Sequence, residues 1–150
     1  MIAYPDTSFL VALYRWQVNS RQAISYFGTM TEALHVTSLV LFEFRQSIRL
    51  QEFLHRRNPR LGFDRATGQA AFAKLQVNIT SGALVLVAAD WNDVIQIADR
   101  VSSQRTPSEG YRSFDILNVA TALHFGAQEF LTFDANQKKL AKAEGLKTPL

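Results

Sequence analysis

The stretch MIAYPDTSFLVAL, residues 1–13, places a short apolar segment, an acid and a helical pattern in that order. Its apolar beginning is bounded by Pro5, which indicates a strand that ends there. Thr7 or Ser8 then predicts the start of a helix, because a hydroxyl side chain can cap the first turn. Asp6 stands at the junction. It is either a helix cap or one part of a site that the rest of the chain completes.

The same alternation of short apolar segments and helical patterns continues along the chain. Further strands are expected at residues 36–37, 83–88, 129–133 and 146–148, and further helices at residues 20–34, 38–57, 65–79, 90–101, 114–126 and 135–144. This order predicts an α/β domain with a central, mostly parallel sheet of four to five strands flanked by helices. The stretch SSQRTPSEGYRS, residues 102–113, has the composition of a loop.

Length and composition restrict the class of protein. The 150 residues correspond to a single domain, 1–150. With 47% hydrophobic residues, 19% charged residues and a net charge of +3, the composition is that of an ordinary globular protein with a basic balance. The absence of cysteine excludes disulfides and thiolate metal sites. No membrane span or secretory signal is apparent, so a cytoplasmic protein is expected.

Acids occur where the predicted strands end and inside two apolar helices. Asp6, Asp90 and Asp134 directly follow strands, whereas Glu43 and Asp115 interrupt apolar helical segments. Each has a structural alternative. The three strand-end acids can cap helices, and Asp90 has a strong capping signature. Glu43 can pair with Arg45 or Arg49 or lie at the solvent edge of its helix, and Asp115 can complement the helix dipole as a first-turn acid. Because the carboxyl ends of parallel strands meet at one edge of a sheet, four of these acids, all except Asp90, are expected to converge there.

Four converging carboxylates define a particular chemistry. They form an oxygen-rich set of ligands, which suits Mg²⁺ or Mn²⁺ rather than zinc. Crowded carboxylates repel one another, and a divalent ion allows all of them to stay ionised. Such an ion can activate water and stabilise the charge that develops during phosphoryl transfer.

Four motifs resemble the PIN domain family, and more closely its VapC-type toxin ribonucleases of type II toxin–antitoxin systems. They are DTSFLVAL at residues 6–13, LVLFEF at 39–44, YRSFDILNVATAL at 111–123 and EFLTFDANQKKLA at 129–141. The resemblance extends over residues 2–147 and implies a three-layer α/β/α PIN-like fold. The last two motifs are the most specific, since order, spacing and flanking apolar residues are preserved together.

The resemblance implies a site and an activity. The metal-binding acids of the family fall on Asp6, Glu43, Asp115 and Asp134, and its assisting hydroxyl groups on Thr7 or Ser8 and on Thr132. The implied activity is Mg²⁺- or Mn²⁺-dependent endoribonuclease cleavage of structured RNA, such as tRNA. The implied partners are a small VapB-like antitoxin that blocks the site and a second copy of the chain in a homodimer.

Two residues depart from the pattern of the family. Asn118 stands where many relatives carry His, one helical turn after Asp115, and Pro5 precedes the first acid, where an apolar or β-branched residue is usual. Neither departure removes a proposed metal ligand.

Basic residues gather in and after the predicted helix 38–57. They are candidates for contacts with RNA phosphates, together with a loop arginine near Asp115, and the set is Arg45, Arg49, Arg56, Arg57 and Arg112. The alternative is a solvated charged face in which Glu52 and Asp64 neutralise the nearby arginines.

Other classes with acids after parallel strands fit less well. A phosphoreceiver domain needs an adjacent acidic pair after the first strand, and a phosphatase of the haloacid dehalogenase type needs a second Asp at the position of Ser8. A non-catalytic PIN-like RNA-binding module is the alternative from another functional class. Such modules usually lack one or more of the acids, and metal-dependent RNA cleavage separates the two hypotheses.

Overall fold

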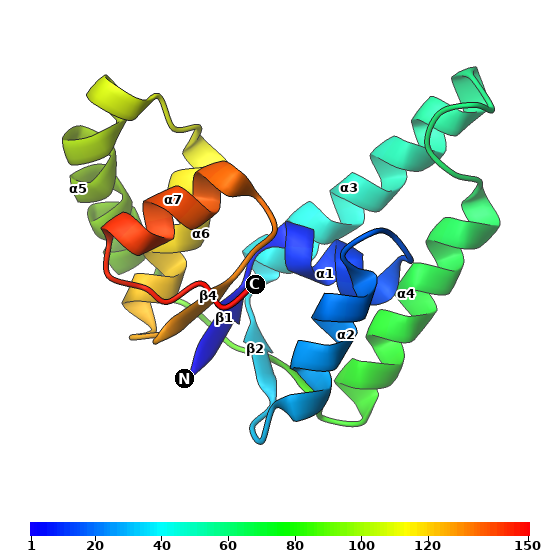
Figure 1. Ribbon diagram of the computed structural model, residues 1–150, viewed down its shortest axis with the longest axis horizontal. Coiled ribbons are helices and arrows are strands. Elements are labelled where there is room, and N and C mark those ends of the chain that lie inside the picture. Colours follow the sequence, from blue (N-terminus) through cyan, green and yellow to red (C-terminus); the bar gives the residue numbers. More distant parts are fainter.

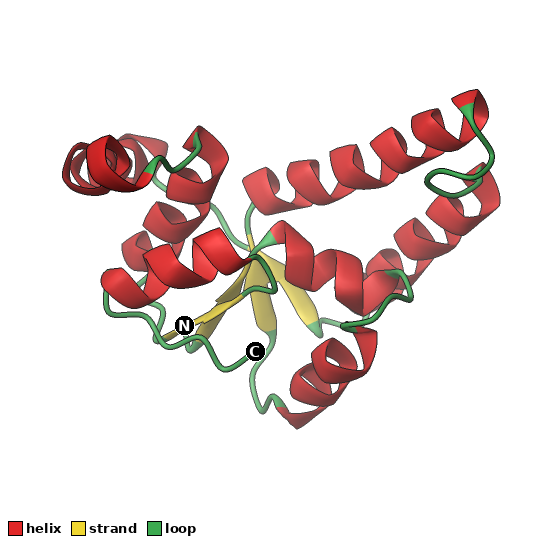
Figure 2. Cartoon of the chain, turned by 45° about the horizontal axis from the view of Figure 1, so that its top comes forward, coloured by secondary structure: helices red, strands yellow, loops and turns green.

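Four short parallel strands form the centre of the protein in a computed structural model that describes residues 1–150. They are β1 (Ala3–Pro5), β2 (Leu34–Val36), β3 (Leu84–Leu86) and β4 (Glu129–Leu131). β1 pairs with β4 and β2 pairs with β3, while β1 lies beside β2, so the strands follow the order β3-β2-β1-β4. Figure 2 shows the strands side by side among the helices. The strand expected at residues 146–148 is reduced to a single bridge between Lys147 and Glu129.

Seven helices enclose these strands in two outer layers. α1 to α4 lie on one side and α5 to α7 on the other, and α3 and α4 extend together away from the strands as an arm (Figure 1). The predicted three-layer α/β/α fold is therefore confirmed. The helices are α1 (Thr7–Tyr14), α2 (Ser20–Thr29), α3 (Ser38–Arg57), α4 (Arg65–Thr80), α5 (Trp91–Glu109), α6 (Ser113–His124) and α7 (Ala135–Ala143).

Four of the helices begin at an aspartate whose carboxylate accepts a backbone N–H of the first turn. These N-caps are Asp6 for α1, Asp64 for α4, Asp90 for α5 and Asp134 for α7. The expectation that Thr7 or Ser8 caps α1 in place of Asp6 is wrong. Thr7 already belongs to the helix, whereas Asp6 keeps the extended backbone that an N-cap requires.

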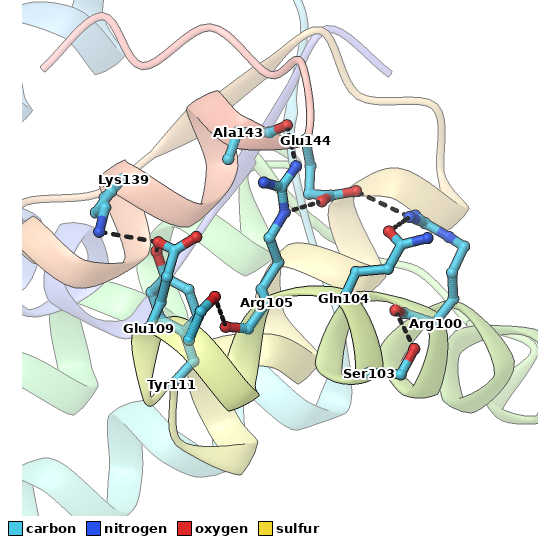
Figure 3. A network of polar contacts seen from close by, with 10 residues as sticks. Arg100, Ser103, Gln104, Arg105, Glu109, Tyr111, Lys139, Ala143 and Glu144 are labelled. Carbon is cyan, nitrogen blue, oxygen red and sulfur yellow. Dashed lines mark hydrogen bonds and ion pairs between the residues drawn. The ribbon is translucent and has the colours of Figure 1, made fainter.

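The C-terminal half of α5 is the largest departure from the predicted elements. Residues 102–109 are helical, although Pro107 lies inside the helix and α5 ends only at Gly110, whose φ is +72°. Contacts with α7 hold this half in place (Figure 3). The carboxylate of Glu144, just after α7, forms ion pairs with Arg100 and Arg105, and the nitrogen–oxygen distance is 3.1 Å in each pair. The prediction of a loop failed because the contacts that stabilise this helix come from a segment about 40 residues further along the chain.

Glu144 is expected to contribute measurably to stability through these two arginines. Its side chain is only 7% exposed, so Glu144→Gln leaves two guanidinium groups without their shared anion. Because both arginines are partly solvated, we expect a loss of about 1–2 kcal/mol in the free energy of unfolding in urea. Asp99→Asn on the exposed side of α5 is the matched control. An equal loss in both variants would contradict this role of Glu144.

The apolar side chains of α3 are only partly buried. The buried ones are Val40, Leu41, Phe44 and Ile48. The side chains of Phe42, Leu50 and Phe53 are each about half exposed. The helix carries apolar residues on two faces. One face packs against α1, and α3 also packs against α4.

Candidate metal centre

Asp6 anchors the acidic edge of the strands. It follows β1, is completely buried and donates its backbone N–H to Leu131 of β4 at 3.0 Å. One carboxylate oxygen, Oδ1, accepts the Ser8 hydroxyl at 2.7 Å and the Phe9 N–H at 3.0 Å. The other oxygen, Oδ2, accepts the Thr132 hydroxyl at 2.6 Å. The carboxylate is thus fixed in orientation by three donors from both ends of the chain.

Asp134 lies beside Asp6 because the junctions β1–α1 and β4–α7 are bonded to each other. The Ser8 hydroxyl accepts the N–H of Phe133 at 2.8 Å, and the Thr132 hydroxyl accepts the N–H of Asp134 at 3.0 Å. The Asp134 carboxylate caps α7 through the N–H of Gln137 and is close enough to Asp6 to disfavour its ionisation. Ser8 and Thr132 therefore hold two acids of the predicted set together.

Glu43 and Asp115 form a second pair of neighbouring acids. Glu43 projects from α3 and accepts the side-chain amide of Asn118, on α6, at 2.8 Å. Asp115 occupies the first turn of α6, where it is 6% exposed and accepts the backbone N–H of Arg112 at 3.4 Å. The Arg112 guanidinium lies 3.5 Å from the same carboxylate. The hydroxyl of Thr7 is buried near Glu43 without a hydrogen-bond partner.

Burial dominates the electrostatics of the acids. Burial raises the pKa of Asp6 to about 6, although the hydroxyl groups of Ser8 and Thr132 act in the opposite direction. Burial also raises the pKa of Glu43, and the neighbouring Asp115 adds to this effect. Below the acids, the buried hydroxyl of Tyr4 is hydrogen-bonded to Thr37 at 2.7 Å. The site thus favours a positive charge that would let its carboxylates ionise.

The side chains present fit a hard divalent cation in chemistry but are not yet gathered around one point. All four acids offer oxygen ligands, and the orphaned buried oxygens of Thr7 and Asn118 lie beside Glu43. However, no three acidic or histidine side chains of the protein approach closely enough to form a ready-made cation site. The acids stand in two pairs, Asp6 with Asp134 and Glu43 with Asp115.

Asn118 is the site residue whose contact the sequence reasoning missed. It was noted only as a departure from the pattern of relatives. Its position three residues after Asp115 places both side chains on one face of α6, and this spacing was the available signal. The structure shows the amide fully buried and bonded to Glu43, so it links α6 to α3 across the acidic edge.

The five arginines predicted to contact RNA are placed in two regions. Arg112 lies at the acidic edge, paired with Asp115. The other four belong to α3, where Arg57 stacks over the ring of Phe53 at 5.7 Å and Arg49 lies over Phe72 at 5.9 Å. None of the protein's ion pairs involves these four arginines.

The fold and its acids define the class of protein: a parallel α/β domain with two pairs of carboxylates, one of which lies where β1 and β4 end. The sequence matches the PIN domain family over residues 3–143, and the chain belongs to that family. No curated protein sequence matches the chain. None of the helices is both long and apolar enough to cross a bilayer.

Solved structures share the fold at low sequence identity. The toxin VapC20 of Mycobacterium tuberculosis, described as cleaving the sarcin-ricin loop, is 21% identical, with a TM-score of 0.65 over 96% of this chain and 95% of that one. FitAcB from Neisseria gonorrhoeae is 16% identical, with a TM-score of 0.66 over 98% and 96%. VapBC2 from Rickettsia felis, bound to a DNA fragment from its promoter, is 14% identical, with a TM-score of 0.63 over 99% and 97%.

Proposed function

We propose that the protein is a VapC-like toxin, an Mg²⁺- or Mn²⁺-dependent endoribonuclease that hydrolyses RNA phosphodiester bonds. The observation that supports this proposal is the pairing of Asp6 with Asp134 and of Glu43 with Asp115 within a PIN domain. No other ligand type accompanies these carboxylates, so the donor set is specific for hard cations.

Each of these residues would have a role that follows from its contacts. Asp6 and Asp115 would hold the principal ion, Glu43 would reach it directly or through water, and Asp134 would complete the set. When bound, the ion supplies an activated water and neutralises charge on the phosphate. Ser8 and Thr132 keep the Asp6 carboxylate in one orientation. The free hydroxyl of Thr7 is available to orient water or a phosphate oxygen.

Asn118 controls the position of Glu43, one of the acids that would hold the ion, because its amide is the donor bonded to that carboxylate. A fixed donor also favours the ionised form of Glu43, which is the form that binds a cation. Asn118 is thus a positioning residue in the proposed mechanism.

Removal of the Asn118 amide is expected to weaken metal binding. In Asn118→Leu the side-chain volume is retained, but Glu43 loses its donor and its fixed orientation. We expect Mn²⁺ affinity, measured by titration calorimetry, and the rate of RNA cleavage to fall roughly 10- to 100-fold.

Asn78→Leu is the control for this effect, since that amide donates to the Tyr14 hydroxyl at 2.9 Å, away from the acids. Unchanged Mn²⁺ affinity in Asn118→Leu, or an equal loss in Asn78→Leu, would show that Asn118 does not position a metal ligand.

The proposed partners are a small VapB-like antitoxin and a second copy of the chain, in the cytoplasm. The similarity to the VapBC2 structure supports an antitoxin, since that name denotes a toxin–antitoxin pair. Exposed apolar side chains on α3 and at the start of α6, including Phe42, Phe53 and Phe114, support a protein contact. Light scattering of the purified chain, alone and with the antitoxin, tests both partners.

The alternative of a non-catalytic RNA-binding module makes a different prediction. It requires RNA binding without cleavage in the presence of Mn²⁺. All four acids are retained, which favours the enzyme. The decisive assay incubates labelled RNA with the purified chain, with Mn²⁺ or with a chelator. Cleavage only with the ion supports the nuclease, and intact RNA in both conditions rejects it.

A further inference from the structure

A pocket of about 720 Å³ lies between α3 and α4, on the arm that extends away from the strands. Its wall carries three arginines, an imidazole and one aromatic ring, from Arg49, His55, Arg56, Arg65 and Phe72. None of the acids at the edge of the strands belongs to it. The pocket is therefore a second, separate polar site, and the proposed nuclease mechanism does not use it.

The three arginines of this pocket outnumber its two acids, Glu52 and Asp64, and form no ion pair with either of them. Asp64 uses its carboxylate to cap α4 through the N–H of Thr67 at 2.9 Å. One carboxylate oxygen of Glu52 is buried against α4 and accepts no hydrogen bond there. The approach is so close that a Cβ on Gly68 would lie 2.0 Å from that oxygen. Glu52 and Asp64 thus have other contacts in place of ion pairs with the neighbouring arginines.

The pocket faces away from the acidic edge. A helix turns about 100° per residue, so Arg49 and Arg56 point about 120° and 140° away from Glu43 around α3. They are displaced from Glu43 by roughly 9 and 20 Å along the helix axis at 1.5 Å per residue. A ligand in the pocket would thus not occupy the acidic edge, although one long polymer could reach both places.

The chemistry of the pocket matches a nucleotide unit of RNA. Guanidinium groups present paired N–H donors that suit phosphate oxygens. The ring of Phe72, with the Arg49 guanidinium 5.9 Å from its centre, and the imidazole of His55 offer flat surfaces for a base. An acidic peptide would use the arginines but not these flat surfaces. RNA is therefore the class of ligand that accounts for the arginines, the aromatic ring and the imidazole together.

We propose that the α3–α4 pocket binds a phosphodiester and an adjacent base of the RNA at a point outside the segment that is cleaved. The inference rests on the proposed function, because it assigns a second contact on the same substrate. The pocket would fix where a structured RNA lies against the acidic edge. It would thereby contribute to the choice of cleavage site without taking part in the chemistry.

The test measures RNA binding without cleavage. A fluorescein-labelled 20-nucleotide single-stranded RNA is titrated with protein in a chelator, and anisotropy is followed over a series of salt concentrations. Arg49→Ala and Arg56→Ala are each expected to lower affinity about fivefold near 0.1 M salt, and to reduce the slope of log K against log salt by about 0.7. Arg56→Lys retains the charge and is expected to retain the slope of log K against log salt. This variant replaces the alanine variant in the comparison if the alanine variant does not fold.

Controls separate a specific site from general charge. Arg21→Ala and Lys74→Ala each remove one exposed positive charge outside the pocket. Their affinities and slopes are expected to stay near the wild-type values. Equal losses in the control and pocket variants would overturn the inference, as would wild-type binding by both pocket variants. Loss of antitoxin binding with unchanged RNA binding would identify a protein surface and overturn it as well.

Failure of the inference is distinguishable from failure of the proposed function. If the chain cleaves RNA with Mn²⁺ while the pocket variants bind RNA normally, the nuclease stands and the second site is rejected. If the pocket variants lose RNA affinity but the wild-type chain never cleaves RNA, the second site stands and the enzyme is rejected. A wild-type chain that neither binds nor cleaves RNA rejects both.

Discussion

Asp6→Asn is expected to reduce Mn²⁺-dependent RNA cleavage by roughly a hundredfold or more while leaving the fold intact. The substitution removes the negative charge but retains the shape and one acceptor oxygen. The N–H of Phe9 and the hydroxyl groups of Ser8 and Thr132 can still contact the side chain. A large loss of activity without unfolding would therefore report the lost charge at the metal site.

Asp90→Asn is the matched control for this experiment. Asp90 also follows a strand and also caps a helix, through the N–H of Asn92 at 2.9 Å, but it is exposed and lies outside both acid pairs. Its variant is expected to retain activity within about twofold, since a neutral Asn still caps a helix. Full activity in Asp6→Asn, or an equal loss in both variants, would contradict the proposed centre.

The free energy of unfolding of the metal-free protein is expected to fall as the pH rises from about 4 to above 6. Burial raises the pKa of Asp6 in the folded protein to about 6, against an ordinary value of 3.8 for an aspartate side chain. Between these values the folded state holds a proton that the unfolded state has released, so increasing pH favours unfolding. A difference of about two pH units corresponds to about 3 kcal/mol. The raised pKa of Glu43 acts in the same direction.

Urea denaturation at pH 4, 5, 6 and 7 in the presence of a chelator measures this dependence. Asp6→Asn lacks the titrating group, so the difference between the variant and the wild-type protein isolates its contribution. That difference is expected to grow in favour of the variant with increasing pH. A difference that stays constant across the range would show that Asp6 titrates normally in the folded protein.

A divalent ion is expected to reverse this loss at neutral pH. Saturation with Mn²⁺ at about 100 times its dissociation constant would add about 2.7 kcal/mol to the free energy of unfolding of the wild-type protein. Asp6→Asn should gain far less. The buried carboxylate thus makes the empty site a source of instability that the cation relieves.

The sequence predicted the order of strands and helices well because that order depends on local signals. Pro5 and Asp6 mark one strand end, and EFLTFD marks another. The meeting of these ends then follows from parallel topology alone. The capping role of Asp6 was misassigned, because a strand-end acid and a first-turn hydroxyl give similar capping signals in sequence.

The remaining errors share one physical cause: a local pattern carries no information about distant partners. Residues 102–109 have the composition of a loop, but Glu144 and α7 stabilise them as a helix. The two apolar faces of α3 look alike in sequence, and only packing against α1 determines which is buried. The bond between Asn118 and Glu43 joins residues 75 positions apart.

The hydrogen bond between Asp6 and Thr132 joins residues separated by 126 positions. Contacts of such separation close large loops, and they form late in folding. During synthesis, a growing chain that ends before β4 already contains Asp6, Glu43 and Asp115. It lacks the strand that pairs with β1, the hydroxyl that orients Asp6 and the fourth acid. The order of translation thus keeps the unfinished chain from assembling its acidic edge.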